Sequence, residues 1–117
     1  SYTFITKDNT TIGTGSRSYE LKPVPAEFAL KDNYPNPFNP RTTIQYDLPI
    51  SGNVSVIIYN VAGQEVAKLV NSAQEAGYHS VVWNGTNVSG AKAAAGIYFY
   101  QIQAGGFVRT KKMLLLK

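Results

Sequence analysis

The chain has 117 residues, 44% of them hydrophobic and 12% aromatic, which suits one folded domain with a modest core and a short additional segment. It contains no cysteine, so a disulfide scaffold and thiolate metal sites are excluded. No apolar run approaches the roughly 18 residues of a membrane-spanning helix, so we expect no transmembrane segment.

The net charge of +4 is unevenly distributed along the chain. Residues 1–75 hold six basic and seven acidic residues, whereas residues 76–117 hold five basic residues and no acid: Lys92, Arg109, Lys111, Lys112 and Lys117. A basic end can protect an exposed edge strand from aggregation, or it can attract an anionic partner. We do not expect nucleic acid to be that partner, because clustered arginines, glycine-rich phosphate loops and recognised binding motifs are absent.

The first part of the chain predicts a hairpin and a linker. Residues 1–6 and 18–22 alternate in the manner of strands and flank a segment rich in Gly, Thr and Asn. The sequence PVPAEF at residues 23–28 then predicts a stiff extended linker. Because the chain begins within a predicted strand, we expect residues 1–27 to be the last hairpin of an upstream domain plus its linker. Residues 28–117 form the second predicted unit.

A proline-rich segment, which we call the clasp, precedes the first clear strand. It comprises Pro35, Asn36, Pro37, Phe38, Asn39 and Pro40. Proline fixes φ and reduces the freedom of the unfolded chain, so the clasp is predicted to be a preformed structural element. The asparagines, together with Asn33, can bond nearby backbone groups. Phe38 is the expected apolar anchor that closes one end of the domain.

The remainder of the chain predicts short strands at residues 42–49, 53–60, 65–70, 77–85, 96–103 and 107–117. No segment is long enough to predict a helix. This pattern favours an all-β fold, specifically an immunoglobulin-like β-sandwich of about seven antiparallel strands, preceded by the short hairpin and the proline-rich linker.

Four segments, taken in order, carry a family resemblance: LKDNYPNPFNPRTTIQYDLP, VIIYNVAGQEVAKLV, AGYHSVVWNGTNVSG and GIYFYQIQAGGFVRTKKMLLLK. Together they resemble the type A C-terminal sorting domain of the type IX (Por) secretion system, a relative of the immunoglobulin-like module of the flagellar hook-capping protein. The resemblance covers about residues 28–117.

The resemblance implies a non-catalytic signal domain at the carboxy end of a secreted cargo protein. It implies two protein partners in a diderm bacterium, an outer-membrane translocon and a sortase-like peptidase that removes the domain. The cargo would pass through the periplasm and be released or attached to anionic lipopolysaccharide at the cell surface. The peptidase site is expected within residues 21–30.

By position, the same resemblance assigns recognition by the translocon to the last hairpin, at Gly96, Tyr98, Tyr100, Arg109, Lys111, Lys112 and Lys117. A terminal basic strand with apolar residues and an unpaired edge also has the ingredients of β-strand addition to a partner. The structural alternative is that residues 113–116 fill the core while the lysines stay solvated.

The aromatic residues permit a second function, that of a carbohydrate-binding or structural accessory module of a secreted enzyme. Tyr98 and Tyr100 share one face of a predicted strand with Ile102, and with Tyr78 and Trp83 they could form a stacking platform for sugars. The alternative is that Trp83 lies in the core and the tyrosines cover a face with their hydroxyls in water.

Catalysis finds little support in the sequence. His79 is the only histidine and has no second metal ligand two residues away along its strand. A nucleophile would require His79 to meet a serine such as Ser80 and an acid, and no motif indicates this arrangement. We therefore expect no enzyme activity and no cofactor.

Overall fold

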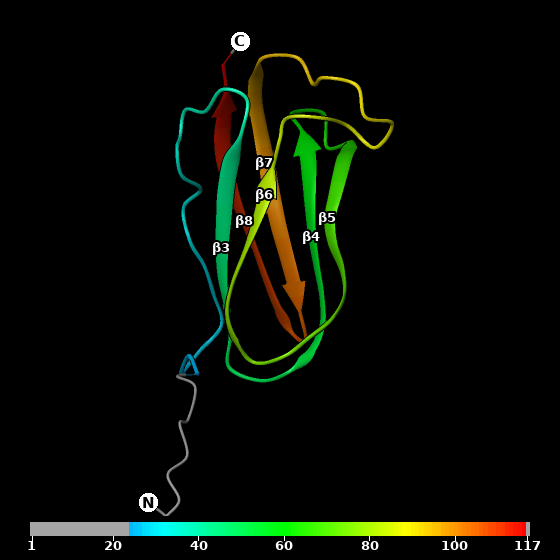
Figure 1. The fold of residues 1–117 in the computed structure, drawn as a ribbon. Coiled ribbons are helices and arrows are strands. Elements are labelled where there is room, and N and C mark those ends of the chain that lie inside the picture. Colours follow the sequence, from blue (N-terminus) through cyan, green and yellow to red (C-terminus); the bar gives the residue numbers. More distant parts are fainter. Residues whose placement is uncertain (1–23, 117) are drawn as a thin grey trace, which may run out of the picture.

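The computed structural model describes residues 24–116, and the hairpin predicted within residues 1–22 lies outside this range. All regular structure in the described residues is β (Figure 1). The strands are β2 (Ala29–Leu30), β3 (Thr42–Leu48), β4 (Gly52–Asn60), β5 (Glu65–Gln74), β6 (Gly77–Trp83), β7 (Gly96–Ala104) and β8 (Phe107–Leu115). None of the described residues belongs to a helix that could cross a membrane.

The strands form two sheets that pack as the layers of a sandwich (Figure 1). One sheet has the order β2-β3-β6 and the other β5-β4-β7-β8, and all paired strands are antiparallel. The predicted immunoglobulin-like sandwich is therefore confirmed. Strand β5 extends to Gln74, four residues beyond the prediction, because its polar end pairs with β4 up to Gly52 although it shows no hydrophobic alternation.

Alternation along the strands builds the core between the sheets. Ile44, Tyr46 and Leu48 of β3 are buried, and so are Val54, Val56 and Ile58 of β4. On β7 the buried positions are Tyr98, Tyr100 and Ile102. Since side chains along a strand alternate between its two faces, these sets point into the space between the sheets.

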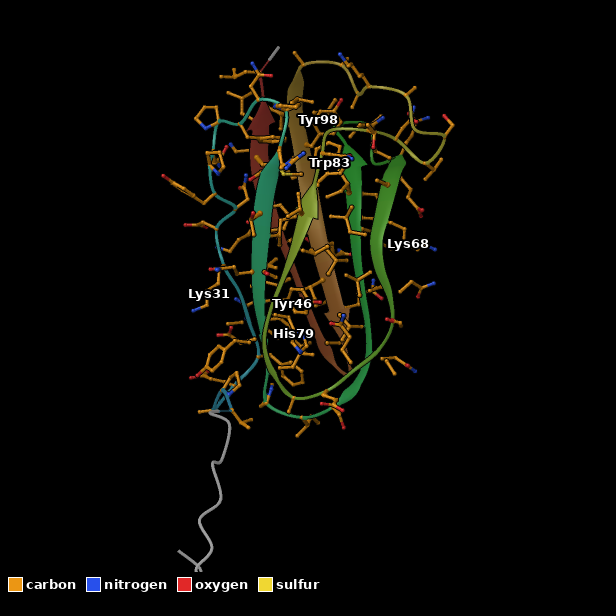
Figure 2. The ribbon with its side chains drawn as sticks, viewed as in Figure 1. Lys31, Tyr46, Lys68, His79, Trp83 and Tyr98 are labelled. Atoms are coloured by element: carbon orange, nitrogen blue, oxygen red, sulfur yellow. The ribbon has the colours of Figure 1, made fainter. Side chains whose placement is uncertain are left out.

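Three aromatic side chains close one end of this core. Trp83 is 1% exposed, and its Nε1–H donates to the carbonyl of Thr86 at 2.8 Å. The ring centroid of Phe38 lies 5.7 Å from that of Trp83. The ring of Tyr98 meets that of Trp83 edge to face with centroids 5.2 Å apart, and both residues are labelled in Figure 2. The prediction of a core tryptophan is confirmed, and Phe38 is buried beside it at 1% exposed.

The segment before β3 crosses from one sheet to the other. Tyr34 forms a bridge with Thr43 of β3, in the first sheet. Four residues later, Phe38 pairs in parallel with Leu115 of β8, in the second sheet. The Phe38 N–H donates to the carbonyl of Leu114 at 3.0 Å. The clasp thus joins the two layers along one side of the sandwich.

A single hydroxyl strengthens this connection. Tyr100, on β7 of the second sheet, is fully buried at 0% exposed. Its hydroxyl accepts the N–H of Asn33 at 2.9 Å and donates to the carbonyl of Lys31 at 2.8 Å. Residues 31–33 follow β2 of the first sheet, so this side chain ties the two layers together.

Substitution of Gly85 tests how closely Pro40 of the clasp packs against the turn after β6. Gly85 has φ +77°, and a Cβ there would meet the carbonyl oxygen of Pro40 at 2.9 Å, whereas Gly90 has φ +87° and open space around it. We expect Gly90→Ala to lower the free energy of unfolding by about 1–2 kcal/mol, the cost of a left-handed alanine, and Gly85→Ala to lower it by at least about 1 kcal/mol more. Chemical denaturation measures both values. Equal losses would contradict the tight contact.

Tyr100→Phe is expected to lower the free energy of unfolding by about 1–3 kcal/mol, because it leaves the Asn33 N–H and the Lys31 carbonyl without their partner. Burial raises the pKa of the Tyr100 hydroxyl from its ordinary value of 10.0 to about 12. Since the folded-state pKa is the higher one, this stabilisation is complete below pH 10 and is lost as the pH rises through about 12.

The wild type should therefore lose more stability between pH 10 and 12 than Tyr100→Phe does. Burial also raises the pKa of Tyr46 and Tyr98, but both remain in the two proteins and cancel in the comparison. Tyr34→Phe, which alters an 80% exposed side chain, is the matched control and should behave as wild type. Identical pH profiles for Tyr100→Phe and wild type would refute the assignment.

Candidate functional site

The last strand, β8, lies at an edge of its sheet. It pairs with β7 from Ala104↔Phe107 to Gly96↔Leu115, and no other strand borders it in the part of the chain that the structure describes. Successive residues of a strand send their N–H and C=O groups to opposite sides. Leu114 directs both groups away from β7 and toward the clasp, so Val108, Thr110 and Lys112 direct theirs away from β7 as well.

The clasp covers only the carboxy-terminal part of this edge. The Leu114 carbonyl accepts the N–H of Phe38, and the Leu114 N–H donates to Asn36 Oδ1 at 3.1 Å. The Leu116 N–H donates to the carbonyl of Phe38 at 2.8 Å. The part that precedes these bonds, residues 108–112, has no such backbone partner among residues 24–116. We call residues 108–112 the open edge.

The basic side chains of the open edge divide between two faces of the sheet. Arg109 lies over the ring of Phe107 at 5.0 Å from the centroid, and Phe107 stacks on Phe28 at 5.2 Å. Lys111 Nζ forms an ion pair with Asp32 Oδ1 at 3.0 Å, and the Asp32 side chain is 88% exposed. Lys112 points to the other face and is exposed.

These placements bear directly on the residues assigned to recognition. Arg109 and Lys112 are exposed and Lys111 is partly exposed, whereas Lys117 lies outside the described residues. Gly96 begins β7 with φ +144°, a conformation that favours glycine. Backbone geometry therefore explains why glycine occupies this position. A partner could reach the three basic residues without disturbing the core.

Tyr98 and Tyr100 belong to the core, which contradicts the sugar platform, the direct contact with a translocon and the solvated hydroxyls that were expected of them. They are 7% and 0% exposed, so they cannot form a stacking platform for sugars or be contacted directly by a translocon while the domain is folded. Their hydroxyls are not in water, because Tyr98 donates to the carbonyl of Ala94 at 2.6 Å and Tyr100 forms the bonds described above. The shared parity with Ile102, which is also fully buried, was the sequence signal for this placement.

No catalytic grouping forms around the histidine. His79 points inward and stacks on Tyr46 with ring centroids 5.3 Å apart, while its Nε2 lies 2.7 Å from the carbonyl oxygen of Glu75. Ser80 is exposed on the opposite face of β6, so the two side chains diverge. Within residues 24–116, no three His, Asp or Glu side chains gather as metal ligands.

Known proteins resemble this chain in fold. A crystal structure of dimeric latent PorU from Porphyromonas gingivalis is 22% identical with a TM-score of 0.60, over 78% of this chain and 10% of that chain. PorZ is described as an essential bacterial surface component of the type-IX secretion system of the same organism. It is 20% identical with a TM-score of 0.52, and the match covers 77% of this chain and 11% of the PorZ chain. This chain thus spans about a tenth of the length of either protein.

A third structure, FLGD from P. aeruginosa, is 29% identical with a TM-score of 0.50 and is covered over 58% of its length by 63% of this chain. None of the curated proteins matches. The family described as the FlgD Ig-like domain matches residues 40–106, which is more than half of the chain and includes the strands from β3 to β7. The chain therefore belongs to the FlgD Ig-like domain family.

Proposed function

We propose that residues 28–117 are a non-catalytic C-terminal sorting domain, which directs an upstream cargo protein through the type IX translocon of a diderm bacterium. The observation that carries the proposal is the open edge, a basic strand segment whose outward backbone groups are free of partners among the described residues. The likeness in fold to PorU and to PorZ, a named component of that secretion system, supports the choice of machinery.

Recognition would proceed by β-strand addition. An extended segment of the translocon pairs with the outward N–H and C=O groups of Val108, Thr110 and Lys112. Arg109 and Lys111 on one face of β8, and Lys112 on the other, attract acidic side chains on both faces of the added strand. No acidic residue follows Glu75 in the sequence, and the carboxylate that contacts the last hairpin is that of Asp32, which pairs with Lys111 at 3.0 Å. Arg109 and Lys112 therefore supply most of this attraction.

The clasp gives this edge a defined length. Because Asn36 and Phe38 already occupy the backbone groups of Leu114, an added strand would have to end before that residue. A short and positively charged edge is also a poor template for pairing with another copy of itself. The clasp therefore has a structural role that favours one partner over self-association.

Processing by a sortase-like peptidase would occur upstream of the packed residues. Pro25 is buried, Phe28 stacks on Phe107, and Ala29–Leu30 pair with β3. A peptidase that binds an extended chain could not accommodate these residues without unfolding them. We therefore place the cut before Pro25, and the released cargo would remain secreted or be joined to anionic lipopolysaccharide at the cell surface.

The export role predicts the behaviour of two matched variants at the open edge. In Thr110→Pro the outward N–H is removed, whereas Thr110→Ala keeps it, and both lose the bond from Gln101 Nε2 to Thr110 Oγ1. A proline whose missing N–H faces solvent is tolerated in an edge strand, so we expect the two stabilities to agree within about 1 kcal/mol. A periplasmic reporter fused to residues 28–117 should reach the cell surface with Thr110→Ala and remain inside with Thr110→Pro.

Surface display would be measured in a host with the type IX system, beside the same host without it. Normal display of a folded Thr110→Pro fusion would exclude strand addition at this edge. Deletion of residues 108–117 is a poorer test, because it removes Met113 and Leu115, which are 1% and 4% exposed in the core.

The division of the chain at residue 28 stays a prediction, and limited proteolysis tests it. Dilute protease should cut first between residues 22 and 25, where the predicted linker precedes the packed residues, and the fragment beginning near Pro25 should resist further digestion with an unchanged unfolding midpoint. Mass spectrometry of the fragments identifies the cut. Uniform resistance across the first 25 residues would mean that they are integral to the sandwich.

A further inference from the structure

The outer face of the β2-β3-β6 sheet carries two exposed tyrosines. Tyr34 is 80% exposed and Tyr78 is 62% exposed. The register places Tyr34 opposite Thr43, which pairs with Val82, and places Tyr78 opposite Asp47. With Lys31, Gln45 and Ser80 these residues form what we call the tyrosine face. It lies on the opposite side of the sandwich from the outer face of the sheet that contains β8.

The backbone holds both tyrosines firmly although their side chains are exposed. Tyr34 exchanges two hydrogen bonds with Thr43, each at 2.9 Å, so it extends the sheet as an additional strand residue. Tyr78 lies within β6, next to Gly77 at its start. Because a tyrosine side chain has only two torsions, a ring on a fixed backbone binds a partner with little loss of conformational entropy, which is why tyrosine is common at recognition surfaces.

The surface between the rings is polar and electrically balanced. Thr43, Gln45 and Ser80 supply hydroxyl and amide groups, and Gln45 pairs directly with Ser80 across β3 and β6. The charged residues of the face form one pair, with Lys31 Nζ 3.5 Å from Asp47 Oδ2. The charges of these two residues therefore cancel within the face, and the exposed Arg41 lies two residues before Thr43 in the chain.

The spacing of the rings suits an extended ligand. The rows of Thr43 and Asp47 are four residues apart, about 14 Å along the strand, and Tyr34 and Tyr78 lie on opposite sides of β3, about 10 Å apart across the sheet. A ligand that contacts both rings must cross the sheet diagonally over Gln45 and Ser80.

We propose that the tyrosine face binds a neutral oligosaccharide several sugar residues long. The apolar faces of two sugar rings stack on Tyr34 and Tyr78, and the hydroxyls between them exchange hydrogen bonds with Gln45, Ser80 and Thr43. Stacking surfaces combined with a few placed amides and hydroxyls are the chemistry that an uncharged polyhydroxylated ligand requires.

The same face fits other macromolecules less well. A nucleic acid would require a surplus of basic side chains, and here the one lysine is paired with Asp47. A protein partner would require an apolar centre, whereas the centre of this face is Gln45 and Ser80, and Val82 is the exposed aliphatic residue in the row of Tyr34.

The test uses the full chain and three neutral probes, cellohexaose, xylohexaose and chitohexaose. Isothermal titration calorimetry should detect binding of at least one of them, and in ¹H–¹⁵N spectra the backbone amides of Gln45 and Ser80 should shift on its addition. Tyr34→Ala and Tyr78→Ala should each weaken that binding roughly tenfold or more. Tyr78→Phe, which keeps the ring, should retain most of it.

Tyr59→Ala is the matched control, because Tyr59 is a half-buried tyrosine on β4 of the other sheet and should leave binding unchanged. Absence of heat and of shifts with all three probes at millimolar concentration would overturn the proposal. Binding that survives both alanine variants, or shifts confined to the β8 side, would overturn it too. A protein partner captured through Tyr34 and Tyr78 without any sugar binding would assign the face to protein recognition instead.

Discussion

The hydrogen bonds of the Tyr100 hydroxyl are the constraint on which the rest of the structure depends. A sandwich needs some element to join its layers along their open side, and here the segment after β2 does so. Tyr100 fixes that segment at Lys31 and Asn33, and from there the chain reaches the parallel pairing of Phe38 with β8. Tyr100 thus fixes the start of the segment, and the bonds of Asn36 and Phe38 to Leu114 and Leu116 fix its end against the last strand.

The position of the clasp in turn defines what a partner can reach. Asn36 and Phe38 occupy the backbone groups of Leu114, while Phe28 and Asp32 contact the inner side of β8 at Phe107 and Lys111. What remains is a short edge with basic side chains on both of its faces. The domain therefore combines a stable core, in which its last strand is anchored, with a limited surface on that same strand for recognition.

Much of the fold could be predicted from the sequence, because alternating strands leave a period-2 pattern. That pattern located β3, β4, β6, β7 and β8, and it indicated Trp83 as a core residue. It did not reveal the polar end of β5, where backbone pairing with β4 holds the strand and the side chains are mostly exposed. The burial of Tyr98 and Tyr100 could have been predicted, because they lie on the same face of the strand as Ile102. Tyrosine by itself, however, is compatible with both a core and a surface position.

The candidate site was harder to predict, because it depends on contacts between distant parts of the chain. The run of Arg109, Lys111 and Lys112 indicated a basic strand with side chains on two faces, but only the tertiary structure shows that Asp32 and Phe107 contact one of those faces. Nothing in the local sequence of the clasp shows that Asn36 bonds to Leu114, 78 residues away. The sequence placed Tyr78 with other aromatic residues but gave no sign that it shares a face with Tyr34, because that face arises only when both border β3.

The parallel alignment of the clasp with β8 also has a mechanical consequence. The chain enters at one end of the sandwich and runs toward Phe38 at the other, in the same direction as β8 (Figure 1). A force that pulls the two termini apart therefore acts along these paired segments, and their hydrogen bonds must yield together in shear. A load from a tethered protein would thus be borne collectively, whereas an antiparallel arrangement at this point could open one bond at a time.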